Sequence, residues 1–343
     1  MSPDRKTASR RVRIKDVAEA AGVSTATVSY VLSGKRTVTA PTRERVIEAI
    51  ESLGYRRNTS AMALRTGRSR NVALIVPDVT NPFYTEVLVG AEEKAAQLGL
   101  SVVLRNSNLD AERERGYLRD ALASDFAAVL CTPFTPDLLA AENTGPRAST
   151  PPLVLLDEPV AGAAAACVSV DNVRGGELVA EHLAACGRRR AGAIGAPEGM
   201  PTSVQRIAGF RRRAGELGLE VADTAVGTAV RRTADAVDQA LGIIGADPTI
   251  DAFFAGDDLL AIHLVRALIG RGLRVPEDVA VCGFDDISWA ALSSPPLTTV
   301  RQPSREIGAR AMAMVPRLLA GEQVDDIVLP VELVVRETTG PRG

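Results

Sequence analysis

The chain has 343 residues, of which 46% are hydrophobic, and a formal net charge of −2, so we expect two or three globular units that each bury an apolar core. Its four cysteines, Cys131, Cys167, Cys186 and Cys282, form no Cys-x-x-Cys pair, which fits neither a disulfide scaffold nor a zinc knuckle and favours a reducing cytoplasm. The polar, basic N-terminus and the lack of any run of about 20 apolar residues argue against secretion and membrane insertion.

The small net charge conceals a difference in sign along the chain. Residues 1–70 contain 15 Lys and Arg against 6 Asp and Glu, net +9, whereas the remainder contains 25 against 36, net −11. Neutralising phosphates and releasing their counterions is the main sequence-independent source of DNA affinity, so only the basic segment is suited to DNA. A solvated basic tail is the alternative, but the helical periodicity of this segment argues against it.

Three short amphipathic helices are expected in the basic segment, at about residues 14–21, 24–34 and 41–53. Ser24 can cap the second helix. The segment DVAEAAGVSTATVSYVLSG (16–34) therefore has the form of a helix-turn-helix, in which the first side chains of the second helix reach base edges in a major groove.

The next segment, NTSAMALRTG (58–67), predicts a very short helix that Asn58 caps and that exposes Leu64. Isolated helices shorter than about 12 residues rarely hold in water, so this helix would order only on DNA. There, Leu64 could enter a minor groove and wedge between base steps. The alternative is that Leu64 packs against Tyr55 or against the domain that follows.

From Val72 onward the pattern changes to uniformly apolar runs separated by helical stretches. The runs form two series, at 72–77, 101–104, 127–131 and 153–156, and then at 191–195, 251–255 and 279–284, with helices near 174–185, 203–217 and 257–271. Strands that are apolar on both faces are typical of parallel sheets covered by helices, so two α/β lobes are predicted. Ligands of such folds bind at the carboxyl ends of the strands, here in the cleft between the lobes.

Several segments match, in order, those of a known family: IKDVAEAAGVSTATVSYVL, TRERVIEAIESLGYRRN, VPDVTNPFYTEVLVGAEEKAAQLG, VSVDNVRGGELVAEHL, QRIAGFRRR and CGFDDISWAALSSPPLTTVRQP. Over about residues 13–340 the chain thus resembles the lactose repressor and galactose repressor family of bacterial regulators. The resemblance implies an all-α DNA-binding headpiece, a hinge, and an α/β core like the periplasmic sugar-binding proteins. We expect the headpiece at 1–56, the hinge helix and linker at 57–70, and the core at 71–343, with a first lobe at about 71–170 and 301–325 and a second at about 171–300 and 326–343.

The resemblance also implies which residues contact DNA: Arg13, Ser24, Thr25, Ala26, Thr27, Ser29, Tyr30, Thr37, Thr39, Asn58, Ala61 and Leu64. Thr25 and Ala26 match the family's base-reading pair. Tyr30 departs from the Arg of many members, which can bind guanine with two hydrogen bonds, so the half-site sequence stays open. Arg13, Thr37 and Thr39 resemble contacts that set the register without reading sequence. The match at the hinge favours the wedge role of Leu64.

The family's effector pocket matches Phe83, Tyr84, Asp157, Thr202, Arg206 and Asp285, and we expect Asp78 and Asn81 to line it as well. Carboxylates and a guanidinium bond well to hydroxyls, and an aromatic face can cover a pyranose ring, so we expect a sugar effector. An ordinary ion pair between Arg206 and Asp285, and plain core packing of Phe83 and Tyr84, are the alternatives.

Two positions depart from sugar-responsive members of the family. Gly256 stands where some have Asn, and residues 226–230 lack an aromatic that others supply, for which Trp289 could substitute unless it simply packs. His182 and Cys186, four residues apart on an expected helix, could share a metal, but a buried packing role is the stronger interpretation. No G-x-S-x-G, P-loop, H-E-x-x-H or dinucleotide-binding pattern is present, and no cofactor is expected.

We therefore expect a cytoplasmic homodimer that binds a palindromic operator in double-stranded DNA, most often as a repressor, under control of a small molecule. Whether the effector releases or recruits the protein stays open, and with no heptad tail a tetramer built on a C-terminal helix bundle is not expected. A transport protein is one alternative, but it would need a signal peptide and no basic headpiece. An enzyme using Asp157, Asp257 or Asp285 as acid or base is the other, but no nucleophile or metal set accompanies them.

Overall fold

The computed structural model describes residues 12–33, 36–55, 69–135, 138–139, 150–160, 163, 165–197, 200–229 and 233–341. The chain divides into two compact units, Met1–Gly67 and Arg68–Gly343, and the division falls within the predicted linker. The predicted contacts at Asn58, Ala61 and Leu64 lie outside the described residues. Among the described helices, none combines the length and apolar character needed to cross a lipid bilayer.

The smaller unit contains the three predicted helices, α1 (Ile14–Ala20), α2 (Thr25–Ser33) and α3 (Ala40–Ser52). The backbone amide of Thr27 donates to Ser24 Oγ (3.1 Å), which is the predicted cap of α2. The helices enclose a small core of Val17, Ala18, Ala21, Val28, Val46 and Ala49. Local periodicity and capping therefore suffice to place these helices to within a residue or two.

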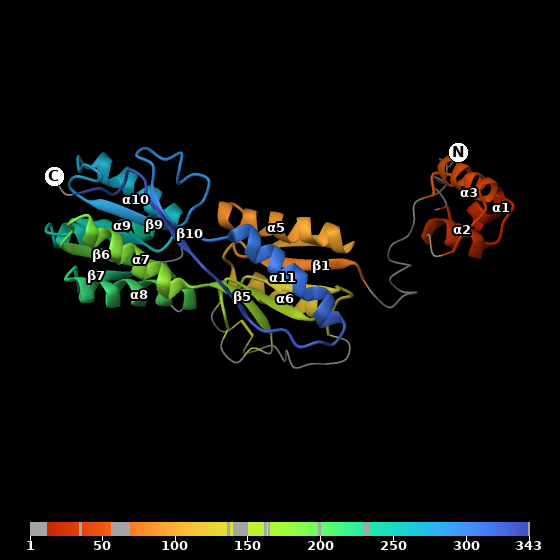
Figure 1. Ribbon diagram of the computed structural model, residues 1–343, viewed down its shortest axis with the longest axis horizontal. Coiled ribbons are helices and arrows are strands. Elements are labelled where there is room, and N and C mark those ends of the chain that lie inside the picture. Colours follow the sequence, from red (N-terminus) through yellow and green to blue (C-terminus); the bar gives the residue numbers. More distant parts are fainter. Residues whose placement is uncertain are drawn as a thin grey trace, which may run out of the picture. The chain divides into compact units, whose positions relative to one another are not determined.

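The larger unit contains two lobes, each built on a six-stranded sheet (Figure 1). The first lobe consists of β1 (Asn71–Val76), α5 (Pro82–Leu98), β2 (Ser101–Asn106), α6 (Ala111–Leu122), β3 (Ala128–Cys131), β4 (Leu153–Leu156), β5 (Ala166–Val170), α11 (Ser304–Leu319) and β11 (Ile327–Leu329). Its strand order is β11-β5-β4-β3-β1-β2, and every pair is parallel.

Strand β1 shows why its sequence is uniformly apolar. Val72, Leu74 and Val76 join the cluster that contains residues of α5 and α11. Ala73 and Ile75 point to the opposite face and join residues of α6. Because successive side chains of a strand alternate between faces, a strand covered on both sides must be apolar throughout. The predicted parallel sheet between helical layers is confirmed.

The second lobe consists of α7 (Asn172–Ala185), β6 (Arg190–Pro197), α8 (Pro201–Leu217), β7 (Glu220–Ala229), α9 (Thr233–Ala246), β8 (Ala252–Ala255), α10 (Asp258–Gly270), β9 (Ala280–Asp285), β10 (Thr298–Arg301) and β12 (Glu332–Val334). Its strand order is β12-β10-β9-β8-β6-β7. The edge strand β12 runs antiparallel to β10, whereas the other pairs are parallel.

One predicted lobe boundary is wrong. The second lobe was expected to resume at about residue 326, but Ile327–Leu329 pairs with β5 and completes the first sheet. The carboxylate of Asp326 anchors this strand, since its Oδ1 accepts a hydrogen bond from the Cys167 amide (2.8 Å). The chain therefore returns to the second lobe only between β11 and β12.

The same kind of helix crossing occurs in both lobes. In the first, a Cβ added to Gly90 would lie 1.9 Å from the Arg305 carbonyl oxygen, and one added to Gly308 would lie 2.0 Å from that of Val87. In the second, a Cβ added to Gly176 of α7 would likewise lie 2.0 Å from the Arg206 carbonyl oxygen of α8. The absence of a side chain at Gly176 thus allows α7 and α8 to pack with their backbones in close contact, and α8 is the helix that carries Arg206.

Candidate functional site

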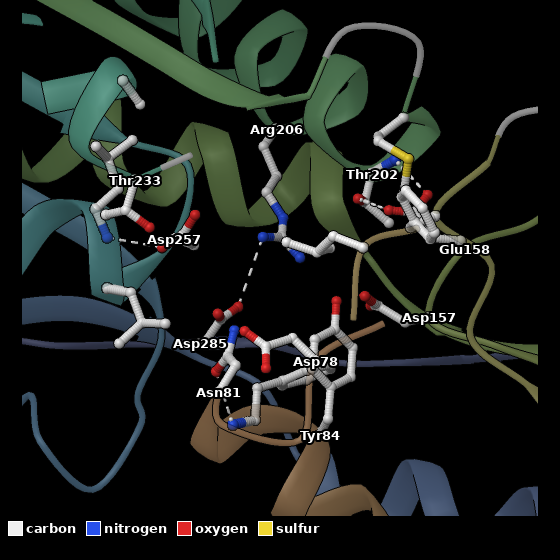
Figure 2. Close-up of a pocket in the computed structure, with 17 residues that line it drawn as sticks. Asp78, Asn81, Tyr84, Asp157, Glu158, Thr202, Arg206, Thr233, Asp257 and Asp285 are labelled. Atoms are coloured by element: carbon white, nitrogen blue, oxygen red, sulfur yellow. Dashed lines mark hydrogen bonds and ion pairs between the residues drawn. The ribbon is translucent and has the colours of Figure 1, made fainter. Parts of the chain in front are cut away.

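A cavity of about 160 Å³ lies between the two lobes, where the carboxyl ends of their strands meet (Figure 2). The predicted effector-binding residues all line it: Asp78, Asn81, Phe83, Tyr84, Asp157, Thr202, Arg206 and Asp285. The fold therefore brings these eight residues together, although the first and last are far apart in the chain. Their role in binding stays a prediction.

Other lining residues were missed at this site: Leu109, Phe134, Glu158, Met200, Thr233, Ala236, Leu259 and Leu260. Glu158 could have been found, since it directly follows Asp157 at the end of a buried strand. Asp257, which sequence reasoning considered only as a catalytic group, also lines the cavity. The apolar members had no signal of their own, because any buried residue of an α/β core has the same pattern.

Arg206 of α8 reaches into the cavity, and Figure 2 shows its ion pair with Asp285. Its Nε donates to Asn172 Oδ1 (2.8 Å) and its Nη1 to the Gly256 carbonyl (2.8 Å). Nη1 also lies 3.5 Å from Asp285 Oδ1, and the guanidinium covers the Phe284 ring at 3.8 Å from its centroid. The ion pair considered as an alternative therefore exists, but it faces the cavity and so is compatible with ligand binding.

Two lining carboxylates sit on strained backbone. Asp157 has φ +63° and Asp285 has φ +118°, values that side chains other than glycine rarely adopt. Gln302 Nε2 donates to Asp285 Oδ1 (2.7 Å), which fixes the direction of that side chain. Such strain persists only where the surrounding structure imposes it, and it clusters at functional sites.

Glu158 connects the lobes directly at the edge of the cavity. Helix α8 begins without a side-chain cap of its own. Instead, Glu158 accepts hydrogen bonds from the Thr202 amide (3.1 Å) and, at short range, from the Thr202 hydroxyl. A carboxylate at a helix N-terminus also interacts favourably with the helix dipole. Glu158 of the first lobe thus caps a helix of the second.

Burial shifts the titration of the cavity's acids. The pKa of Glu158 is raised to about 8, first by burial and then by the neighbouring Asp157 carboxylate, while the hydrogen bonds from Thr202 oppose the shift. Burial likewise raises the pKa of Asp285 to about 8, with Arg206 opposing. The pKa of Asp157 is raised for the same reason.

We expect the ligand-free core to lose stability as the pH rises from 5.5 to 8.5. Glu158 and Asp285 titrate near pH 8 when folded but near pH 4 when unfolded, so the folded protein holds more protons in between. Their stabilising contribution is complete below about pH 4 and is lost as the pH passes through 8. The thermal midpoint across this range measures the effect.

Glu158→Gln should reduce the fall of the thermal midpoint between pH 5.5 and 8.5. Glu92→Gln, which removes a charge from the exposed face of α5, should leave that fall unchanged. A midpoint that rises with pH in the unaltered chain would contradict the assignment.

The smaller unit presents the predicted base-reading residues at the start of α2. Ser24, Thr25 and Ala26 are exposed, whereas Thr27, Ser29 and Tyr30 are half-buried. Arg13, Thr37 and Thr39 are exposed as well. The nine predicted contacts that fall within the described residues are thus at least partly accessible.

Tyr30 has a neighbour that sequence reasoning missed. The Arg36 guanidinium lies over the Tyr30 ring, 5.3 Å from its centroid, which is a cation–π contact. A guanidinium from the loop after α2 therefore lies beside Tyr30, the position at which the resemblance implies Arg in many members of the family.

The structure also describes the surroundings of Trp289 and His182. Trp289 is 49% exposed and is not among the lining residues, so it does not supply the missing aromatic. His182 Nε2 lies 2.7 Å from the Thr339 hydroxyl and 3.7 Å from Cys186 Sγ, and burial lowers its pKa. Among the described residues, no group of three or more His, Cys, Asp and Glu side chains could hold a metal ion.

Comparison with known families matches two parts of the chain. Residues 13–58 match the bacterial regulatory proteins of the lacI family, and residues 180–339 match the periplasmic binding protein-like domain. The first match spans all three helices of the smaller unit, and the second spans most of the second lobe.

Similarity to individual proteins extends over almost the whole chain. The HTH-type transcriptional regulator DegA of Bacillus subtilis (strain 168) is 31% identical over 336 residues, which cover 96% of this chain and 99% of DegA. A solved complex of the transcriptional regulator CelR with cellobiose is 31% identical, with a TM-score of 0.69 over 96% of this chain and all of that one. The lac repressor dimer bound to operator and the anti-inducer ONPF is 26% identical, with a TM-score of 0.84 over the same shares.

Proposed function

Because this chain belongs to the lacI family of bacterial regulatory proteins, we propose that it represses transcription from a palindromic operator and that a sugar bound between its core lobes controls it. The family assignment makes it a DNA-binding transcription regulator, not an enzyme or a transport protein. Operator DNA lies in the cytoplasm of a bacterium, which is where such a regulator acts.

The cavity between the lobes carries the effector part of the proposal. Carboxylates, a guanidinium and two adjacent aromatic rings surround a space with polar groups on several sides. Such a set can bond to the hydroxyls of a sugar and cover its apolar face. The similar CelR structure holds cellobiose, which supports a sugar as the ligand class.

The exposed start of α2 carries the DNA part. Thr25 and Ala26 stand at the end of the helix that a helix-turn-helix directs into the major groove, and the similar lac repressor structure is a dimer on its operator. We infer that this chain also binds DNA as a dimer, with Asn58, Ala61 and Leu64 at the minor groove between the half-sites.

Coupling between the two activities follows from the position of the cavity. Tyr84 and Asp157 come from the first lobe, whereas Arg206 and Asp285 come from the second. A ligand that bonds to both sides favours one arrangement of the lobes, and it can shift the balance only by its difference in affinity for the two arrangements. Coupling of this kind amounts to about 1 to 3 kcal/mol, or about 5- to 150-fold in DNA affinity.

Binding to promoter fragments tests the proposal. Fluorescence anisotropy of the purified chain with DNA from upstream of its own gene should show tight binding that weakens steeply with salt. One or more sugars from a panel should change the affinity at least about fivefold. A chain that binds no promoter fragment in a salt-sensitive way, with or without small molecules, would rule the proposal out.

Leu64→Ala tests the hinge. We expect it to weaken binding to the specific operator by at least about tenfold, because the base step that the side chain would open stays closed. Binding to unrelated DNA should hardly change, because that binding depends on phosphate contacts. Equal loss on both DNAs would show that Leu64 is no wedge.

A further inference from the structure

The cavity between the lobes is lined by far more acidic than basic side chains. Five carboxylates line it, those of Asp78, Asp157, Glu158, Asp257 and Asp285. Among the described lining residues, Arg206 is the one Lys or Arg. A ligand that enters this cavity therefore meets a strongly acidic site.

Arg206 has little positive charge to offer an incoming anion. Its guanidinium already donates to Asn172 and Gly256, lies beside Asp285 and covers the Phe284 ring. The side chain is 5% exposed. The positive charge of this guanidinium is thus largely balanced by groups of the protein itself.

Most of the lining carboxylates also have partners within the chain. Glu158 accepts from Thr202, and Asp257 accepts from the Leu260 amide at 2.8 Å as the cap of α10. Asp285 accepts from Gln302, and Asp78 from the Thr80 amide at 2.9 Å. These four are oriented by the fold itself.

Asp157 is the exception. Its side chain is buried, with 6% of the residue exposed, and its Oδ1 has no hydrogen-bond partner in the described chain. Figure 2 shows the carboxylate of Asp157 at the cavity, beside the ring of Tyr84. A buried acceptor without a donor is unfavourable, so the site lacks one donor that a ligand can supply.

We propose that the effector is an amino sugar of one ring, whose protonated amine pairs with Asp157; this inference rests on the effector role assigned above to the cavity. A hydroxyl could satisfy the Asp157 oxygen, but only a cation also offsets the excess of carboxylates. A phosphate or a uronic acid would add charge of the wrong sign. A cavity of about 160 Å³ is of the size that accepts one six-membered ring.

The titration of the cavity agrees with a cationic ligand. Burial raises the pKa of Glu158 and Asp285 to about 8, so these groups hold protons near neutral pH when no ligand is bound. The groups that face them are Asp157, Tyr84, Asp257, Asp258 and Arg206. When an ammonium group binds, its positive charge can balance the carboxylates of Glu158 and Asp285 in place of the protons that these groups hold in its absence.

Matched pairs of sugars test the proposal in the full chain. Isothermal titration calorimetry at pH 7 would compare glucosamine with glucose, galactosamine with galactose and mannosamine with mannose, with glucuronate as the anion. We expect the amine to bind at least about tenfold more tightly than its neutral partner in one or more pairs, and glucuronate not to bind. Neutral sugars that bind as tightly, or no binding by any of the three amines, would overturn the proposal.

Asp157→Asn locates the interaction, since it removes the charge while keeping the shape. We expect the preference for the amine to fall below about threefold, whereas Glu92→Gln, which removes an exposed charge from α5, should preserve it. An Asn variant that retains the full preference would overturn the role of Asp157. Promoter binding of the same samples separates the two claims: if a neutral sugar controls it, only the amine proposal fails, and if no DNA binds, the regulatory role fails.

Discussion

Arg206→Ala is expected to lower the affinity of the core for its effector by at least about a hundredfold while leaving operator affinity unchanged. The guanidinium contacts Asn172 of α7, the loop after β8 and Asp285 of β9. Its loss would therefore remove the contact that fixes the positions of all three around the cavity. Removing the guanidinium also leaves the Asn172 and Gly256 oxygens without their donor, at a cost of about 1–3 kcal/mol for each unsatisfied group. Helix α2, which is expected to read the operator, belongs to the other compact unit and should be unaffected.

Effector titration by calorimetry and operator binding by anisotropy measure the two halves of this prediction. Arg206→Lys is the matched control: it keeps the charge but lacks the planar fork that bonds to several partners, so it should recover only part of the affinity. An effector response that survives in the Ala variant would remove Arg206 from the binding site.

Gly308→Ala should destabilise the core by about 3 kcal/mol. The added Cβ would lie 2.0 Å from the Val87 carbonyl oxygen and 2.9 Å from the Ala91 amide nitrogen. Both are backbone atoms in the middle of α5, so relief requires α5 and α11 to move apart and loosen the cluster they share with the first sheet. Inserting a methyl group into so close a contact typically costs about 1 to 3 kcal/mol, and a rigid backbone neighbour puts it at the upper end.

Gly116→Ala is the matched control, because this glycine is also helical but its Cβ would meet no atom within 4 Å. We expect it to raise the free energy of unfolding by about 0.5 to 1 kcal/mol, since alanine loses less backbone entropy on folding. Urea unfolding of both variants against the unaltered chain gives the comparison. A Gly308→Ala variant as stable as the Gly116→Ala variant would show that the helices can separate freely.

Some elements could be predicted from local sequence and others could not. Strands β3, β4 and β8 were recognised because all their residues are buried and apolar, and β9 because all its residues before Asp285 are. Strand β10 was not, because its residues are Thr-Thr-Val-Arg and its threonines are buried only through bonds such as that from the Thr299 hydroxyl to Asp258. Strand β11 has three residues, one of them 63% exposed, and exists because β5 offers an edge to pair with.

The sequence by itself determined the three helices of the headpiece, the two series of buried strands and, through its resemblance to a family, the eight polar and aromatic residues of the cavity. These features follow from short-range patterns, because caps and periodicity act over a few residues and motifs lie in continuous segments.

Only the tertiary structure decided how those residues act on one another. It joined Glu158 to Thr202 across the lobes, bound Arg206 to groups of the protein and, within the described residues, left Asp157 Oδ1 without a hydrogen-bond partner. The physical reason is that hydrogen bonding and charge balance depend on distances of a few ångströms between segments far apart in the chain, and these distances arise only when helices and sheets pack.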